Sequence, residues 1–395
     1  PIWFSISDMR DGCLVDRTKE KVTQQALDDC FKTGTVPAGT LLMSFKLTIG
    51  KTTITAVDGV HNEAIVSLIS FLDVSDAIRN YLLYVLPLVV QNGETKSAIK
   101  GKTLNSKSLA KLLIPLPPLG EQQRIVERVR DLLPLVEEYG DLEDEREALD
   151  QVLPDRLRKS ILQQAVSGKL VAQDPADEDA SILVERIRKE KHRLISEGKT
   201  KFPKDGESII YIGSDGCHYE KHIDKKGKVI SETGIQDQIP FEIPNTWTWA
   251  RFTTLTVQVG NKNNQVKSKD IAEYGDYPVI SQSSIRYIDG YCAASQARPI
   301  KSVPVLLFGD HTRAVKFIDH PFVIGADGTK CHNAIVCNPY FLYILMEYFV
   351  YKIRNRGYGR HHALLKNEIM PLPPLPEQQR IVERVKELLA IITSQ

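Results

Sequence analysis

A fifteen-residue segment occurs almost unchanged at two places in this chain. The first copy, PLPPLGEQQRIVERV, covers residues 115–129, and the second, PLPPLPEQQRIVERV, covers residues 371–385. The prolines fix an extended approach and the residues after them favour a helix. The two copies start 256 residues apart, and a long segment repeated in this way predicts that one structural module has been duplicated.

After the prolines of each copy, apolar residues recur at alternating steps of four and three. This alternation is typical of a coiled-coil seam. We therefore predict a helix-pair seam built from Ile125, Val129, Leu132, Val136, Ile381, Val385, Leu388 and Ile392. Pro134 predicts a bend in the first helix. Further helices are expected from about Pro154 to Gly168 and from about Ser181 onward, each ended by a glycine.

The segments that precede the two copies also resemble each other. Residues 36–59 and 302–325 each contain Val-Pro, an apolar strand, a polar turn and a second strand. Residues 1–12 and 278–290 are similar as well. Because the second copy has about 30 further residues upstream, we expect the first module to lack its N-terminal strands. These observations predict an α+β protein made of two αβ modules, each followed by a helix.

Composition narrows the class of protein. No run of eighteen apolar residues occurs, so a membrane span is not expected. Six cysteines without a paired spacing favour a reducing compartment, and we expect a cytoplasmic protein without a metal site. The chain starts without methionine, and we expect it to be a fragment.

Lysines and arginines gather at 96–111 and 352–366, just before each repeated segment, as expected for surfaces that meet phosphate.

These motifs carry a family likeness. The duplicated PLPPLxEQQRIVERV, with LRKSILQQAVSGKL and IPFEIPNTWTWARF between the modules, resembles the specificity subunits of Type I restriction-modification enzymes. The resemblance implies two target recognition domains that read a split DNA sequence, joined by long antiparallel coiled-coil helices in a pseudo-two-fold repeat. It also implies two methyltransferase subunits that carry S-adenosylmethionine, and restriction subunits that use ATP and magnesium. The chain itself would be a non-catalytic DNA-recognition and assembly subunit.

The resemblance sets the expected domain boundaries. The first recognition domain would be truncated at its N-terminus and the last helix at its C-terminus. The expected divisions are recognition domain one at 1–114, a helical spacer at 115–200, an irregular connector at 201–245, recognition domain two at 246–370, and the second helix at 371–395.

Side chains that suit base edges and phosphates occur in polar loops of both modules. In the first module the candidates are Ser5, Ser7, Arg10, Lys46, Lys51, Lys100 and Lys102. In the second module they are Lys262, Asn263, Asn264, Gln265, Lys267, Ser281, Gln282, Ser283, Arg286, His311, Arg313, Arg356, Arg360 and His361. For each of these loops the alternative is a solvated turn without a DNA role.

Two motifs that suggest chemistry have simpler interpretations. Residues 338–341, NPYF, resemble the Asn-Pro-Pro-aromatic motif that grips a flipped adenine in amino-methyltransferases. They contain only one proline, however, and no glycine-rich cofactor loop lies upstream, so they fit a helix start with proline near its first position better. Cys331 and Cys337 lack further spaced ligands and are expected in a core. Two other functions stay open: the recognition half of a self-sufficient methyltransferase-nuclease, and a coiled-coil adaptor that binds proteins.

Overall fold

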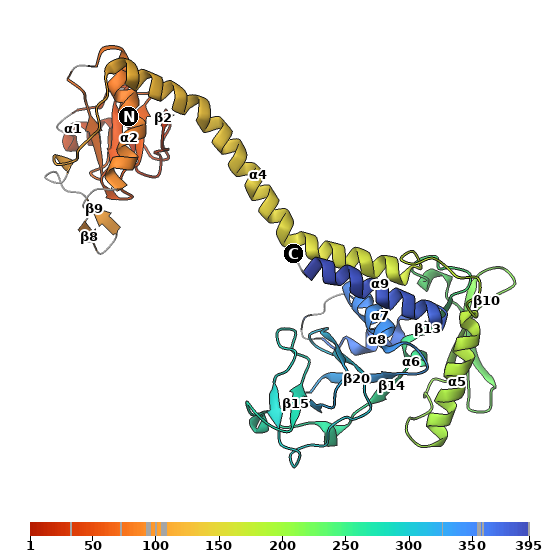
Figure 1. Ribbon diagram of the computed structural model, residues 1–395. Helices are drawn as coiled ribbons and strands as arrows, with labels where there is room; N and C mark the ends of the chain where they lie inside the picture. The colour runs from red at the N-terminus through yellow and green to blue at the C-terminus, as the bar shows by residue number, and fades with distance from the viewer. Residues whose placement is uncertain are drawn as a thin grey trace. The chain divides into compact units, whose positions relative to one another are not determined.

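The computed structural model divides into two compact units, residues 1–147 and 148–395 (Figure 1). It describes the whole chain except residues 32–33, 72, 92–95, 99–100, 104–108, 326, 354–356, 358 and 394–395. Each unit contains its own sheets and helices, as the duplicated sequence predicts.

The first unit is built on a four-stranded sheet in the order β2-β5-β3-β7, and β1 and β6 form a separate parallel pair. Within β3 the side chains alternate between two cores: Leu41 and Met43 pack with helix α2, whereas Leu42 packs with Phe4 on the other face. The elements are β1 (Ile2–Phe4), β2 (Cys13–Val15), α1 (Gln24–Cys30), β3 (Leu41–Ser44), β4 (Lys46–Leu47), β5 (Thr52–Thr55), β6 (Gly59–His61), β7 (Ile65–Leu68), η1 (Val74–Asp76), α2 (Ala77–Gln91), β8 (Lys96–Ala98), β9 (Gly101–Thr103) and the start of α4 (Leu119–Val166).

The second unit repeats this plan with a sheet in the order β14-β20-β17-β18 and a second sheet in the order β16-β15-β19. Its elements after α4 are α5 (Ala180–Ser196), β10 (Glu207–Ile212), β11 (His218–Ile223), β12 (Val229–Gly234), η2 (Gln236–Gln238), β13 (Thr248–Arg251), α6 (Phe252–Leu255), β14 (Thr256–Val259), η3 (Lys262–Asn264), η4 (Ser268–Asp270), β15 (Tyr277–Ile280), β16 (Gly290–Cys292), β17 (Val305–Gly309), β18 (Val315–Ile318), β19 (Val323–Ile324), β20 (Thr329–Ala334), α7 (Pro339–Lys352), α8 (His362–Asn367), β21 (Ile369–Leu372) and α9 (Leu375–Thr393).

The central strands of the two units correspond. Strand β17 alternates as β3 does, with Leu306 and Phe308 in the core beneath α7, and Val305 and Leu307 packed against the β15 side. The parallel pair β15-β19 matches the parallel pair β1-β6. The predicted duplication of an αβ module is therefore confirmed. Strands β13 and β14 and helix α6 precede β15 in the second unit, whereas β1 is the first strand of the first unit.

The helical spacer differs from the prediction in one respect. We expected separate helices before and after Pro154, but α4 is a single helix that continues through Pro134 and Pro154. Both prolines are exposed, so the backbone carbonyl that each leaves without an N–H partner can meet water. The helix expected from about Ser181 is confirmed as α5, which Asp179 caps by accepting from the Ser181 backbone N–H.

Residues 201–245 are more ordered than the irregular connector that their composition suggests. Strands β10, β11 and β12 form an antiparallel three-stranded sheet. The turns between them contain Gly216 and Gly227, both with positive φ, where glycine carries no steric penalty. The glycines and aspartates that indicated a loop thus mark the turns of this small sheet.

The repeated segment builds the same corner in both units. The side-chain amide of Gln122 donates to the Pro117 carbonyl at 2.8 Å, and that of Gln378 donates to the Pro373 carbonyl at 2.9 Å. Both side chains are buried. The glutamine therefore ties the proline turn to the helix that follows it, which gives the repeat a physical reason.

The predicted seam residues lie in different environments. Ile381 and Val385 are fully buried, and α9 packs against α7 within the second unit. Ile125 and Val129 are half-buried, whereas Leu132 and Val136 have exposed fractions of 39% and 63%. Leu388 and Ile392 are half-buried. The pairing of the two seams stays a prediction.

Candidate nucleic-acid interface

Four polar loops of the second unit meet at neighbouring strand ends. Gln265 Nε2 donates to Asp327 Oδ1 at 3.0 Å, and Gln282 Nε2 donates to the Asp327 carbonyl at 2.8 Å. The backbone N–H of His311 donates to Gln282 Oε1 at 3.0 Å, and His311 Nδ1 lies 3.3 Å from the Gly359 carbonyl. Loops that the sequence separates by up to about 100 residues thus form one surface, which we call the loop surface and define as residues 260–269, 281–286, 309–313 and 359–361.

Gln282 joins the parts of this surface. Both ends of its side-chain amide bond to other loops, and its carbonyl accepts from Thr312 Oγ1 at 2.6 Å. Gly328 has a φ of +80°, and a Cβ there would lie 2.8 Å from the His311 ring and 2.9 Å from Gln282 Nε2. The close packing around Gln282 makes it a residue that holds the loops rather than a free group for reading bases.

Other polar candidates are also used within the protein. Asn264 donates to the Arg298 carbonyl at 2.9 Å and accepts from the Asn261 backbone at 2.9 Å. Ser283 Oγ accepts from the backbone of Arg286 at 3.1 Å, which shapes that turn. Arg313, with a φ of 61°, donates to the Ile353 carbonyl at 3.0 Å. These bonds fix the loop conformations.

Two candidates are corrected by their burial. His361 has no exposed surface, and its Nδ1 lies 2.9 Å from the Asp310 carbonyl. Ser281 is 8% exposed, and its Oγ accepts from the Ser283 backbone. Both side chains are enclosed by the protein. The HH pair and Ser281 looked polar and available in the sequence, but packing around β15 and α8 encloses them.

A buried cluster supports the basic loop before α8. Asp310 Oδ1 accepts from the His362 backbone at 2.8 Å, and His362 Nε2 lies 2.9 Å from His332 Nε2. Burial lowers the pKa of His362 to about 4, with Lys366 and Lys330 adding to the effect. Burial likewise sets the pKa of His332 well below its usual range. Both rings are therefore neutral at pH 7, and one donates to the other. The sequence did not predict this supporting role of Asp310 and His362, whose only signal was their position within GDHTR and RHH.

Basic side chains remain exposed on the loop surface. Among the described residues, Lys262, Lys267, Arg286 and Arg360 are exposed, and their charged groups have no hydrogen-bond or ion-pair partner. Asn263 is exposed beside Lys262, and Ile285, next to Arg286, has an exposed fraction of 93%. Free guanidinium and ammonium groups on a fixed loop frame can bond to phosphate oxygens or guanine edges.

The candidate residues of the first unit lie in several different environments. Ser5 Oγ donates to Asp8 Oδ2 at 2.5 Å and bonds to Ser7 Oγ at 2.8 Å. Lys51 donates to the Met9 carbonyl at 3.0 Å, and Lys46 lies 3.6 Å from the exposed Glu63 carboxylate. The remaining candidates of this unit are Arg10, which is exposed, and Lys102, which lies in β9. Lys100, and Arg356 of the second unit, lie outside the described residues.

The two motifs that suggested a chemical function have structural roles in the fold. Asn338 caps α7 by accepting from the backbone of Tyr340 at 2.9 Å, and Pro339 starts the helix, as expected for a helix start. Cys331 and Cys337 are buried in different hydrophobic clusters, and burial raises the pKa of both thiols. Within the described part of the chain, no three histidine, cysteine or acidic side chains gather as metal ligands. No described helix has the length and hydropathy to cross a membrane.

Comparison with known proteins assigns the family. The chain is 26% identical over 338 residues to the Type I restriction enzyme EcoAI specificity subunit of Escherichia coli, which covers 70% of this chain and 53% of that protein. It is 24% identical over 269 residues to the EcoEI specificity subunit of Escherichia coli, covering 59% of this chain and 39% of that protein. The chain thus spans about half or less of the length of these curated relatives.

A solved structure shares the fold. The HsdS subunit from Thermoanaerobacter tengcongensis aligns with a TM-score of 0.50 at 14% identity, covering 91% of this chain and 75% of that one. The family model for the Type I restriction modification DNA specificity domain matches residues 2–137 and again residues 256–395. With two matches that lie on the two αβ units, this chain belongs to the Type I restriction modification DNA specificity domain family.

Proposed function

We propose that this chain recognises DNA as the specificity subunit of a Type I restriction-modification complex in the cytoplasm. Each αβ unit would read one part of a split target, so that two related but different modules recognise two different half-sites. The observation that carries the proposal is the loop surface of the second unit, where exposed basic side chains stand on loops held together by Gln282 and Asp327. The family match to both units supports the same role for each.

The chemistry would lie on partner subunits. Two methyltransferase subunits would carry S-adenosylmethionine and methylate adenine, and restriction subunits would use ATP and magnesium to translocate and cut DNA. This chain would contribute binding and assembly without a catalytic group of its own. That division of labour is supported by the curated relatives, which are specificity subunits.

The exposed residues divide into two roles. Arg286 carries a planar guanidinium at the tip of a loop, which suits bidentate bonding to guanine. Lys262 and Lys267 carry compact ammonium charges, which suit phosphate oxygens of any sequence. Losing a base contact should cost about 1–3 kcal/mol at one base pair, whereas losing a phosphate contact should weaken all sequences alike.

The test is to co-produce this chain with its methyltransferase subunits in cells without other adenine methylation, and then to map methyladenine by single-molecule sequencing. A split motif with an unread spacer is expected. Arg286→Ala should relax the motif at one position, while the matched variant Lys262→Gln should leave the motif unchanged and reduce methylation everywhere.

Two results would contradict the proposal. If the assembled complex methylates no split motif and its DNA affinity does not change with salt concentration, the protein-binding adaptor is favoured, because phosphate contacts make DNA binding salt-dependent. If this chain supports methylation without any partner subunit, the recognition half of a self-sufficient enzyme is favoured.

A further inference from the structure

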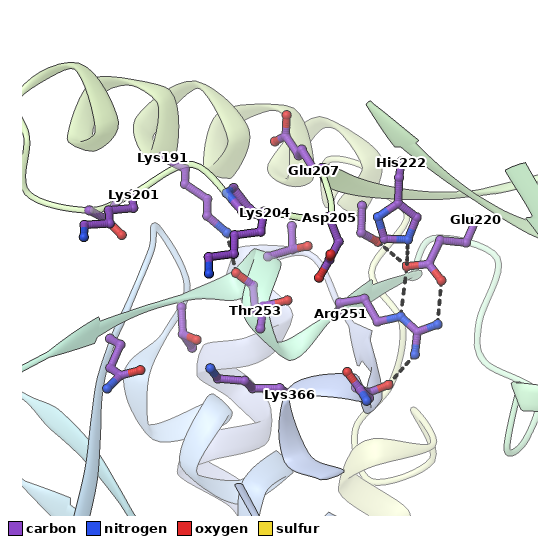
Figure 2. Close-up of a pocket in the computed structure, with 18 of the residues that line it drawn as sticks. Lys191, Lys201, Lys204, Asp205, Glu207, Glu220, His222, Arg251, Thr253 and Lys366 are labelled. Atoms are coloured by element: carbon purple, nitrogen blue, oxygen red, sulfur yellow. Dashed lines mark hydrogen bonds and ion pairs between the residues drawn. The ribbon is translucent and has the colours of Figure 1, made fainter. Parts of the chain in front are cut away.

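A polar pocket of about 680 Å³ lies in the second unit and shares no residue with the loop surface. Helix α5 and the segment around Lys204 form one wall, β11 and β13 form the end with Glu220 and Arg251, and α6 and α8 form the opposite wall (Figure 2). This volume is in the range of small-molecule sites. The family role proposed above gives this pocket no function.

Lys191 is the most unusual group in the pocket. Its side chain extends from α5, the residue is only 7% exposed, and its ammonium donates to the Thr253 carbonyl. An ammonium has three N–H donors, and among the described residues this carbonyl is its one hydrogen-bond partner. Burial lowers the pKa of Lys191 to about 8, because Glu207 offsets the loss of solvation only in part. A buried positive charge with unused donors is stabilised by an anion.

Two of the three carboxylates that line the pocket are already paired, and the third, Asp205, is exposed and forms no ion pair with a lysine among the described residues. Glu220 forms an ion pair with Arg251 at 2.5 Å and accepts from Ser208 at 2.5 Å. Glu207 is bonded to Arg188 at 3.1 Å and to His192 at 3.0 Å. Burial alone would raise the pKa of both carboxyls, but these hydrogen bonds outweigh it and lower the pKa of each. Neither carboxylate therefore supplies a dedicated counter-ion for the lysines.

Three further lysines line the same space. Figure 2 shows the side chains of Lys191 and Lys204 directed toward Thr253, with Lys366 beyond Thr253 on the opposite wall. Lys201 lines the rim. Within the described part of the chain, Lys201, Lys204 and Lys366 form no hydrogen bond or ion pair through their ammonium groups. Ammonium groups from α5, the following segment and α8 thus converge on one cavity.

We propose that this pocket binds a phosphate group, with Lys191, Lys204 and Lys366 as its ligands and Lys201 at its entrance. Several point charges around one space suit a compact, multiply charged anion with many acceptor oxygens better than a single carboxylate. The phosphate could belong to a free phosphorylated compound or to a DNA backbone. The ligand chemistry is the same, and the two sources give different results below.

The test is isothermal titration calorimetry of the full chain with sodium pyrophosphate at low ionic strength, in the absence of DNA. Saturable binding at one site per chain is expected. The double variant Lys204→Gln/Lys366→Gln should bind at least about tenfold more weakly, because two charge-assisted contacts are lost. The control Lys301→Gln removes an exposed lysine outside the pocket and should bind as the parent does. Lys191 stays unchanged in both variants, so the buried packing around it is kept.

A second titration, with a short DNA duplex present, separates the two sources. If the duplex displaces pyrophosphate and binds the double variant more weakly, the pocket holds a backbone phosphate. If pyrophosphate binds equally with and without the duplex, the pocket holds a free phosphorylated compound. The proposal is overturned if pyrophosphate shows no saturable binding, if the double variant binds as tightly as the control, or if a glutamate-rich peptide binds where pyrophosphate does not. Because the first titration contains no DNA, its outcome does not depend on the DNA-recognition function.

Discussion

Replacing Gln378 with alanine should destabilise the second unit by about 3 kcal/mol. Gln378 is fully buried, donates to the Pro373 carbonyl at 2.9 Å and accepts from the Asn338 backbone N–H at 2.8 Å. Alanine leaves both groups without their partner. The buried Pro373 carbonyl accounts for about 2 kcal/mol, and the less buried Asn338 N–H, which precedes α7, for about 1 kcal/mol.

Two other glutamines of the repeated segments provide matched controls. Gln122→Ala removes the single bond to the Pro117 carbonyl at 2.8 Å, and should cost about 1 kcal/mol in the first unit. Gln379 is exposed, and its bond to the Asn338 side chain lies in solvent, so Gln379→Ala should cost less than about 0.5 kcal/mol.

Urea unfolding followed by tryptophan fluorescence compares Gln378→Ala with Gln379→Ala in the second unit, and the Trp3 signal follows Gln122→Ala in the first. Trp247 and Trp249 are buried in the second unit, whereas Trp3 is the one tryptophan of the first, so the signal reports mainly on the unit that contains Gln378. If Gln378→Ala and Gln379→Ala change the free energy of unfolding by the same amount, the two buried bonds do not stabilise the corner and the explanation of the repeat is wrong.

Three further variants test the second unit. Because the pKa of His362 is lowered to about 4 from 6.5, its contribution to stability is complete above pH 6.5 and is lost as the pH falls toward 4. In urea unfolding, His362→Gln should remove up to about 3 kcal/mol of this dependence of the unfolding free energy on pH. If the unfolding free energy of the variant falls as steeply with pH as that of the parent, the ring is not buried in its neutral form. Arg158→Ala should lower the free energy of unfolding by about 1–3 kcal/mol in thermal or urea unfolding, because the variant leaves the mostly buried Glu347 charge, bonded to Arg158 at 2.7 Å, without its partner. An unchanged free energy of unfolding would mean that this pair does not hold α4 against α7. Gln282→Ala should weaken binding to all DNA sequences in a filter-binding assay without changing the methylated motif, whereas a changed motif would make Gln282 a base reader.

The sequence predicted the architecture more accurately than the details of the site. Duplicated apolar and proline patterns are local signals, and they identified two αβ modules and the helix starts near Leu119 and Leu375. The single long α4 was missed because proline was expected to interrupt a helix, although an exposed helix tolerates the lost bond. Residues 201–245 were expected to be an irregular connector rather than a sheet because turn glycines dominated their composition.

For the candidate site, too, the sequence says more about which loops are polar than about where each side chain points. Polar residue types selected candidate loops from the sequence, and the structure brings four of those loops of the second unit together. Whether a given side chain faces solvent or the protein depends on neighbours that are distant in sequence. His361 is enclosed by the packing around Asp310, whereas Arg360, the residue before it, is exposed. No local pattern distinguishes these two neighbours.

The sequence by itself determined that this protein contains two copies of one module, because hydrophobic periodicity and proline position act within a few residues. The tertiary structure alone decided which polar groups are used internally and which remain available. Gln282 became a support for the loops, Arg286 stayed exposed, and Lys191 of α5 came to lie in a pocket with Lys366, which is 175 residues away. The physical reason is that burial and hydrogen-bond satisfaction depend on contacts between segments that only the folded chain brings together.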